Sequence, residues 1–199
     1  KLQYFSDMDL TDDFEELIRL NPTDLRAMDR LAVLYIERKE WQKLVKLYGD
    51  AAENSFAVND KVYFLTQLAQ LYEIAIEDAA LAEKIYKKIL ELNDRNVPAI
   101  SALKRCYTKS ENWSELIAAL QKELDVTLSE KKKAAIYYQL GFIYETKLGA
   151  AKEAINYYKN ALNIKRSHEE AYARLKELFA REGAWDELMT LHQTKLKTL

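Results

Sequence analysis

The sequence of 199 residues contains few glycines and prolines, a single cysteine and no long apolar segment. Its four glycines and two prolines are too few for a fold of many tight turns, which need positive or fixed φ angles. One cysteine cannot form an internal disulfide, so the sequence indicates no redox compartment. The formal net charge of −2 gives no general attraction to nucleic acid or to an anionic membrane. We therefore expect no nucleic-acid binding, and the lack of an apolar run of spanning length predicts no membrane insertion.

The residues that usually carry catalysis or bind metals stand apart in the sequence. His168 and His192 are 24 residues apart, and neither has a carboxylate or thiolate partner at ligand spacing. There is no glycine-rich phosphate loop, and no Ser–His–Asp or Cys–His set can be assembled. We therefore expect no enzyme activity, no catalytic residues, no metal site and no cofactor.

What the sequence does contain is an internal repeat of 72 residues. The three tryptophans, Trp41, Trp113 and Trp185, are separated by 72 residues each, and no gap is needed to align their surroundings. Each 72-residue segment divides again into two shorter repeats of 35 to 37 residues, as the recurrence of Leu-x-x-x-Tyr shows. The positions that keep the 72-residue register include Leu31, Leu103 and Leu175; Tyr35, Tyr107 and Phe179; Tyr72 and Tyr144; Glu73 and Glu145; and Tyr86 and Tyr158.

Each short repeat has the apolar spacing of two helices. Apolar residues at i, i+4, i+7 and i+8 from Ala27 to Tyr35 form one stripe, and residues from Leu44 to Ala51 form a second. Arg38 to Glu40 make a short polar turn between them. The elementary unit is therefore a helical hairpin, and the whole chain should be all-α, with eleven helices.

These positions resemble the tetratricopeptide repeat. The residues that carry the resemblance are Ala27, Leu31, Ala32, Tyr35, Trp41, Leu44, Tyr48 and Ala51 in one repeat, and Leu140, Gly141, Tyr144, Ala154, Tyr158 and Ala161 in another. The resemblance implies a right-handed superhelical solenoid of antiparallel hairpins. It would form one domain over 1–199, with a truncated half-repeat at 1–22 and hairpins at about 23–56, 57–94, 95–128, 129–166 and 167–199. Long arrays of this kind look like those of bacterial tetratricopeptide proteins.

The register also predicts the roles of several notable side chains. Identical spacing is what packing demands, so the tryptophans should lie in the core. Cys106 falls at a position held by leucine in the other copies and should be a small buried side chain. His168 aligns with Asp24 and Asn96, which predicts a helix start, and Ser167 with Glu170 predicts a capping box there.

The family resemblance places a binding surface on the concave side, along the first helix of each hairpin. The lysines, asparagines and arginine that clamp an acidic chaperone tail in some members are missing from this surface. Aromatic residues occur on it where sibling repeats have polar or small ones, so they are better binding candidates than the tryptophans. The alternative is ordinary partial burial of these rings against adjacent helices. The expected binding residues are Tyr63, Gln67, Gln70, Arg105, Tyr138, Phe142 and Arg174.

The resulting expectation for function is a scaffold that binds a partner protein or peptide on its concave face. The alternative is a regulatory or targeting domain of a larger enzyme whose catalytic part lies outside these residues. The apolar stripes of the first and last helices have no further repeat to cover them, which suggests a segment of a longer array. Weak head-to-tail self-association through these ends is a further expectation.

Overall fold

The computed structural model describes residues 2–22 and 24–196. In this described part the chain forms eleven α-helices and one π-helical segment, with no strand, so the all-α prediction is confirmed. The chain divides into two compact units, Lys1–Ala102 and Leu103–Leu199. We call these the N-terminal unit and the C-terminal unit, and each is described by itself.

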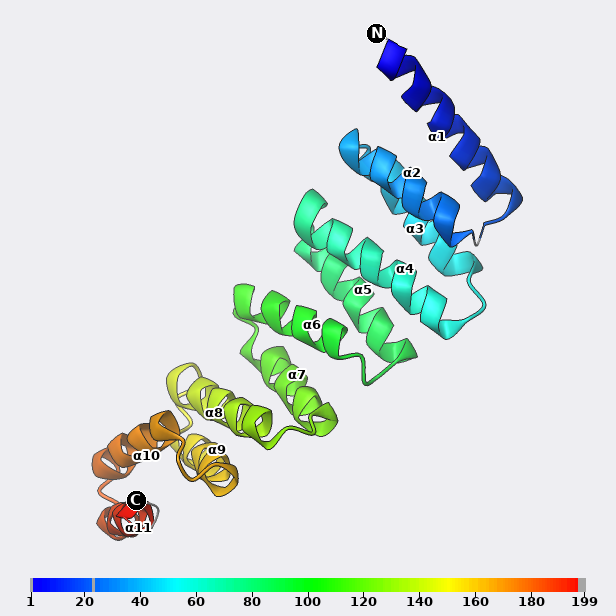
Figure 1. Ribbon diagram of the computed structural model, residues 1–199. Helices are drawn as coiled ribbons and strands as arrows, with labels where there is room; N and C mark the ends of the chain where they lie inside the picture. The colour runs from blue at the N-terminus through cyan, green and yellow to red at the C-terminus, as the bar shows by residue number, and fades with distance from the viewer. Residues whose placement is uncertain (1, 23, 197–199) are drawn as a thin grey trace. The chain divides into compact units, whose positions relative to one another are not determined.

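The N-terminal unit is built from successive helices joined by short turns (Figure 1). Helix α1 precedes two hairpins, α2–α3 and α4–α5, and α4 continues into a π-helical segment, η1. Helix α6 begins in this unit and crosses its boundary. The bounds are α1 Leu2–Leu20, α2 Leu25–Glu37, α3 Trp41–Asn54, α4 Val58–Leu71, η1 Tyr72–Ile76, α5 Ala79–Leu92 and α6 Val97–Lys109.

The C-terminal unit contains the end of α6 and five further helices (Figure 1). Helices α8 and α9 form one hairpin, and α10 and α11 form the next. The bounds are α7 Trp113–Val126, α8 Glu130–Thr146, α9 Ala151–Ile164, α10 Glu169–Arg181 and α11 Trp185–Leu196.

The turns inside the hairpins keep the 72-residue register in their backbone conformation. Lys39, Glu111 and Gly183 have φ angles of 56°, 54° and 67°. Such left-handed residues commonly end a helix, and glycine adopts the conformation at least cost. Two of the three copies use a lysine or a glutamate there, so scarcity of glycine does not prevent these turns.

Side-chain caps explain where several helices begin. The Asp24 carboxylate accepts hydrogen bonds from the backbone N–H groups of Arg26 and Ala27, at 3.0 and 3.1 Å. His168 holds the corresponding position before α10, and its Nδ1 accepts from the Ala171 N–H at 3.4 Å. The prediction that His168 marks a helix start is confirmed. The predicted capping box at Ser167 is wrong, because the N-cap is His168, one residue later.

The core of the C-terminal unit depends on a close approach between α8 and α9. Tyr158 on α9 is fully buried, and its ring lies against Gly141 on α8. A Cβ atom at Gly141 would come within 2.7 Å of two Tyr158 ring atoms. Glycine at this position therefore allows the tyrosine ring to lie directly on the α8 backbone.

The tryptophans begin the second helices of their hairpins, at the starts of α3, α7 and α11, but the prediction that they are core is wrong. Trp41 and Trp113 are half-buried, and Trp185 is 64% exposed. The Lys147 ammonium lies 4.7 Å from the centroid of the Trp113 ring, so part of the cover over that ring is a charged side chain. Cys106 is half-buried, which is less than its leucine-like position predicted.

We expect Gly141→Val to destabilise the C-terminal unit by about 1–3 kcal/mol, because the added methyl groups must displace the Tyr158 ring. Chemical denaturation followed by circular dichroism measures the change. The matched control is Gly49→Val on α3, where a Cβ would meet nothing within 4 Å. Equal effects of the two substitutions would show that the contact with Tyr158 does not limit residue size at Gly141.

Candidate functional site

The seven residues predicted to bind a partner lie on first helices of the hairpins. Tyr63, Gln67 and Gln70 are on α4, Arg105 on α6, Tyr138 and Phe142 on α8, and Arg174 on α10. The α4 residues belong to the N-terminal unit and the other four to the C-terminal unit. Arg105 is exposed.

On α4 the three predicted residues follow i, i+4 and i+7 spacing and therefore share one side of the helix. Tyr63 is exposed, and its hydroxyl donates to the Asp29 carboxylate on α2 at 3.4 Å. Burial, together with the nearby Asp29 charge, raises the pKa of Tyr63. Gln67 is half-buried and Gln70 is exposed. This side of α4 presents two amides beside one tyrosine ring.

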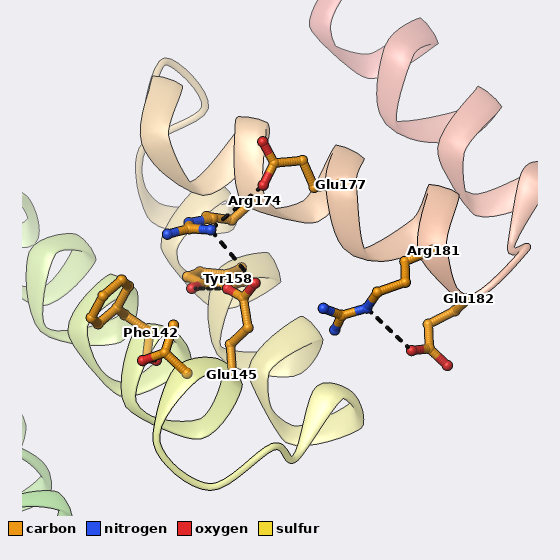
Figure 2. A network of polar contacts seen from close by, with 8 residues as sticks. Phe142, Glu145, Tyr158, Arg174, Glu177, Arg181 and Glu182 are labelled. Carbon is orange, nitrogen blue, oxygen red and sulfur yellow. Dashed lines mark hydrogen bonds and ion pairs between the residues drawn. The ribbon is translucent and has the colours of Figure 1, made fainter.

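In the C-terminal unit the structure brings two predicted residues into direct contact. The Arg174 guanidinium carbon lies 5.5 Å from the centroid of the Phe142 ring, within the range of a cation–π interaction. Arg174 Nη1 is also 3.7 Å from Glu145 Oε1 and 3.5 Å from Glu177 Oε2 (Figure 2). We call Tyr138, Phe142, Glu145, Arg174 and Glu177 the Phe142–Arg174 cluster.

The carboxylate of Glu145 is the buried anchor of this cluster. Its side chain is only 9% exposed, and the Tyr158 hydroxyl donates to Glu145 Oε2 at 2.8 Å. A buried carboxylate needs both hydrogen bonds and an opposite charge to offset its desolvation. Tyr158 supplies the first and Arg174 the second, so the packing of α8 on α9 determines where the Arg174 charge is held.

Tyr138 connects the cluster to the beginning of α10. Its ring stacks on the His168 imidazole, with centroids 5.2 Å apart and planes inclined by 29°. Its centroid is also 5.6 Å from that of Tyr158. Tyr138 is half-buried and Phe142 is 37% exposed. Tyr138 is therefore the inner, partly buried ring of the cluster, and Phe142 is the outer ring that faces solvent.

The first copy of the 72-residue repeat has the same anchor without the rest of the cluster. The Tyr86 hydroxyl donates to Glu73 Oε2 at 2.8 Å, as Tyr158 does to Glu145. The tyrosine–glutamate bond is thus part of the repeat's own packing. The residues 72 positions before Tyr138, Phe142 and Arg174 are Thr66, Gln70 and Ala102. The aromatic and cationic members are additions that the shared packing does not require.

Sequence reasoning missed the two residues that position this cluster, Tyr158 and His168. The repeat register gives both of them structural roles, one in the packing and one at a helix start, and both roles are real. Pairing them with their neighbours requires the helix–helix geometry.

Within the described residues no group of three or more His, Cys, Asp and Glu side chains is placed to hold a metal ion. No helix in that part of the chain is long and apolar enough to cross a membrane.

Comparison with known proteins gives both a family model and structural relatives. A model of the tetratricopeptide repeat matches residues 99–134. The crystal structure of MamA protein is similar over 85% of this chain and 88% of its own, at 20% identity and a TM-score of 0.52. YrrB, described as a TPR protein with an unusual peptide-binding site, is similar over 87% of this chain and 86% of its own, at 14% identity and a TM-score of 0.50. Among curated protein sequences none matches significantly.

The chain contains a tetratricopeptide repeat and has the fold of tetratricopeptide-repeat proteins. The matched segment begins two residues into α6 and ends in α8, so it covers most of α6, the whole of α7 and the start of α8. At these identities the structural likeness establishes the fold alone. The Phe142–Arg174 cluster lies on first helices, α8 and α10, which is where the resemblance places the concave side.

We expect the stability of this helical-repeat protein to fall as the pH rises above about 10, where tyrosines of the unfolded chain ionise. Burial raises the pKa of Tyr48 to about 12, and burial followed by the Glu145 hydrogen bond raises that of Tyr158 further. The folded state therefore keeps protons that the unfolded state loses, so its free energy of unfolding declines from about pH 10 upward.

Denaturant titrations at about pH 8, 10 and 11, on either side of the tyrosine pKa of the unfolded chain, measure this decline. Tyr158→Phe removes one of the groups and should give a shallower decline relative to its own stability at the lowest pH. A slope equal to that of the unsubstituted chain would contradict the assignment of Tyr158 as a residue that stays protonated in the folded state.

Proposed function

We propose that the chain is a protein-interaction scaffold and that the Phe142–Arg174 cluster binds a peptide segment of a partner protein. The observation that carries the proposal is the partly exposed Phe142 ring beside Arg174, at positions where the first copy of the repeat has Gln70 and Ala102. Exposed aromatic rings and arginines are the residue types that contribute most to binding energy in protein interfaces. YrrB, which has the same fold, is described as having a peptide-binding site.

The charges of the cluster indicate what kind of peptide it would accept. Arg174 is flanked by two carboxylates, Glu145 and Glu177, and Glu177 is 64% exposed. One positive and two negative charges leave the cluster with a net charge of about −1 when all three groups are ionised. A partner segment that places an apolar side chain against Phe142 and a lysine or arginine near Glu177 would match both features.

We expect peptides selected by display on the whole chain to lose affinity when Phe142 is truncated. Phe142→Ala should weaken binding by roughly 30-fold, which corresponds to the roughly 2 kcal/mol typical of a central interface residue. Phe56→Ala, at an exposed phenylalanine between α3 and α4, is the matched control and should leave affinity unchanged. Glu177→Lys should reduce binding of basic peptides in particular. Selected peptides that bind all three variants as well as the unsubstituted chain would place the binding site elsewhere.

We also propose weak self-association through the first and last helices, α1 and α11. Trp185 and Met189 are exposed on α11, and Leu17 and Leu20 are exposed on α1. Covering such apolar side chains with another surface removes them from water, which favours association.

The regulatory or targeting alternative, in which the chain serves a larger enzyme, has no comparable observation in its favour.

Self-association predicts that the weight-average mass rises with concentration in sedimentation equilibrium. Replacing both Trp185 and Met189 by serine should suppress the rise. Phe56→Ser is the control, because Phe56 is fully exposed but lies in the segment between α3 and α4. A constant monomer mass up to millimolar concentration, or equal suppression by both changes, would count against this contact.

A further inference from the structure

A groove of about 740 Å³ lies in the C-terminal unit between α9 and α11, with α10 as its floor. Leu162 lines it from α9, Leu175 and Phe179 from α10, and Leu191 from α11. These apolar side chains lie on the floor and on both walls, while Thr190 and other exposed polar residues form the rim. The combination of an apolar floor and a polar rim is typical of a docking groove.

The groove is separate from the Phe142–Arg174 cluster. Tyr172, Leu175 and Phe179 line it from one side of α10. Arg174 and Glu177, the two members of the cluster on α10, lie on another side of the same helix. A ligand in the groove would therefore meet a surface that the proposed peptide site does not use.

One side-chain difference between successive hairpins lies at the groove. In the preceding pair of second helices, α7 and α9, Tyr157 extends across the corresponding position. Its ring stacks on Tyr144 with centroids 5.2 Å apart, its centroid is 6.4 Å from that of Tyr137, and its hydroxyl accepts from Gln121 Nε2 on α7 at 3.3 Å. Tyr157 thus connects α7, α8 and α9.

In the next hairpin the same positions are filled differently. Tyr172 and Phe179 correspond to Tyr137 and Tyr144, each 35 residues later. Tyr157 and Leu191 are each the seventh residue of their helices, α9 and α11. The Tyr172 hydroxyl lies 2.6 Å from Nδ1 of His192, the residue after Leu191. Leucine lacks the ring and the hydroxyl of tyrosine, so Leu191 leaves more room between α9 and α11 than a tyrosine at this position would.

Charged side chains line the groove at both of its ends, and Lys159 on α9 adds a cation 5.4 Å from the centroid of the Phe179 ring. Arg166 and Lys195 lie where α9 and α11 end, and Asp186 and Glu187 lie in the first turn of α11. Lys195 is also paired with Glu169 and lies 5.0 Å from the centroid of the Tyr172 ring, while Arg166 is exposed. The separation of about nine residues from Asp186 to Lys195 along α11 corresponds to about 14 Å, or between two and three helical turns.

We propose that this groove is a second docking site, and that its occupant is an amphipathic helix of a partner protein with acidic residues in its first turn and basic residues in its last. Such a helix would run antiparallel to α11. Its N-terminal end would face Arg166 and the carbonyl ends of α9 and α11, where both the side-chain charge and the helix dipoles are favourable. Its apolar stripe would cover Leu162, Phe179 and Leu191, as in other helix-in-groove complexes.

The test uses two displayed libraries of helical peptides, each about 14 residues long, with the same randomised apolar stripe. One library has acidic residues in the first turn and basic residues in the last, and the other has the reverse. We expect peptides of the first polarity to be enriched on the whole chain and to bind about tenfold or more tightly than their reversed counterparts. Failure to enrich either library, or equal enrichment of both, would overturn the proposal.

Two substitutions locate the binding and test its polarity. Leu191→Tyr restores the side chain found at the equivalent position of the preceding hairpin and should reduce the affinity of selected peptides about tenfold or more. Arg166→Glu changes an exposed residue, carries little risk to folding, and should favour the reversed polarity. Phe142→Ala is the control and should leave these affinities unchanged, which separates this site from the proposed peptide site.

Other outcomes are equally decisive. Binding that survives both Leu191→Tyr and Arg166→Glu would show that the peptides bind outside the groove. Concentration-dependent self-association that Leu191→Tyr abolishes would assign the groove to a second copy of this chain and overturn the partner-helix proposal. Circular dichroism of each variant establishes that loss of affinity is measured on folded protein.

Discussion

The contact between Gly141 and Tyr158 is the constraint on which the proposed peptide site depends. Because α8 has no Cβ at Gly141, the Tyr158 ring can lie on the helix backbone with its hydroxyl 2.8 Å from Glu145. Glu145 in turn holds the Arg174 guanidinium, which lies over the face of Phe142. A hydrogen bond in the hairpin core thus determines the position of a charge on the surface. A shift in the packing of α8 on α9 would move the Arg174 charge as well.

Duplication explains how such a site could arise without cost to the fold. The N-terminal unit has its own tyrosine–glutamate bond, between Tyr86 and Glu73, and there Ala69 occupies the position equivalent to Gly141. Ala69 is fully buried, so the repeat accommodates a methyl group at that position in one copy. The bond itself belongs to the common packing. Once this packing exists, the neighbouring surface positions are free to differ, and a charged or aromatic side chain there affects binding more than folding.

The periodic sequence predicted helix positions well because helix starts depend on local chemistry. The starts of α3, α7 and α11 at the three tryptophans follow from the 72-residue register. The cap at His168 follows from its alignment with Asp24 and Asn96, both of which accept hydrogen bonds from the backbone of the helix they begin. Such interactions span only a few residues, so one repeat predicts the next.

Burial and the candidate site were less predictable, because they depend on which side chains approach from other helices. Trp113 and Trp185 hold the same repeat position, yet Lys147, just after α8, covers part of one ring and the other is 64% exposed. Phe142 and Arg174 can each be identified from their places on first helices. Their connection through Glu145 cannot be identified in this way, because it depends on how α8, α9 and α10 pack against one another and not on the repeat register along any one helix.

Helix α10 shows how the two proposed sites can coexist in the C-terminal unit, because it contributes to both. An α-helix directs side chains to all sides, and the residues three and four apart share a side. Tyr172, Leu175 and Phe179 line the groove, while Arg174 and Glu177 face the cluster. Leu175 is fully buried at the bottom of the groove, so core packing holds α10 in place. A ligand on either side therefore contacts a helix whose position is already fixed. Because no side chain is shared, occupancy of one site need not displace a ligand from the other. A partner that offers both a basic peptide and an amphipathic helix could therefore engage the C-terminal unit twice, and its affinity would gain from the high effective concentration of the second segment.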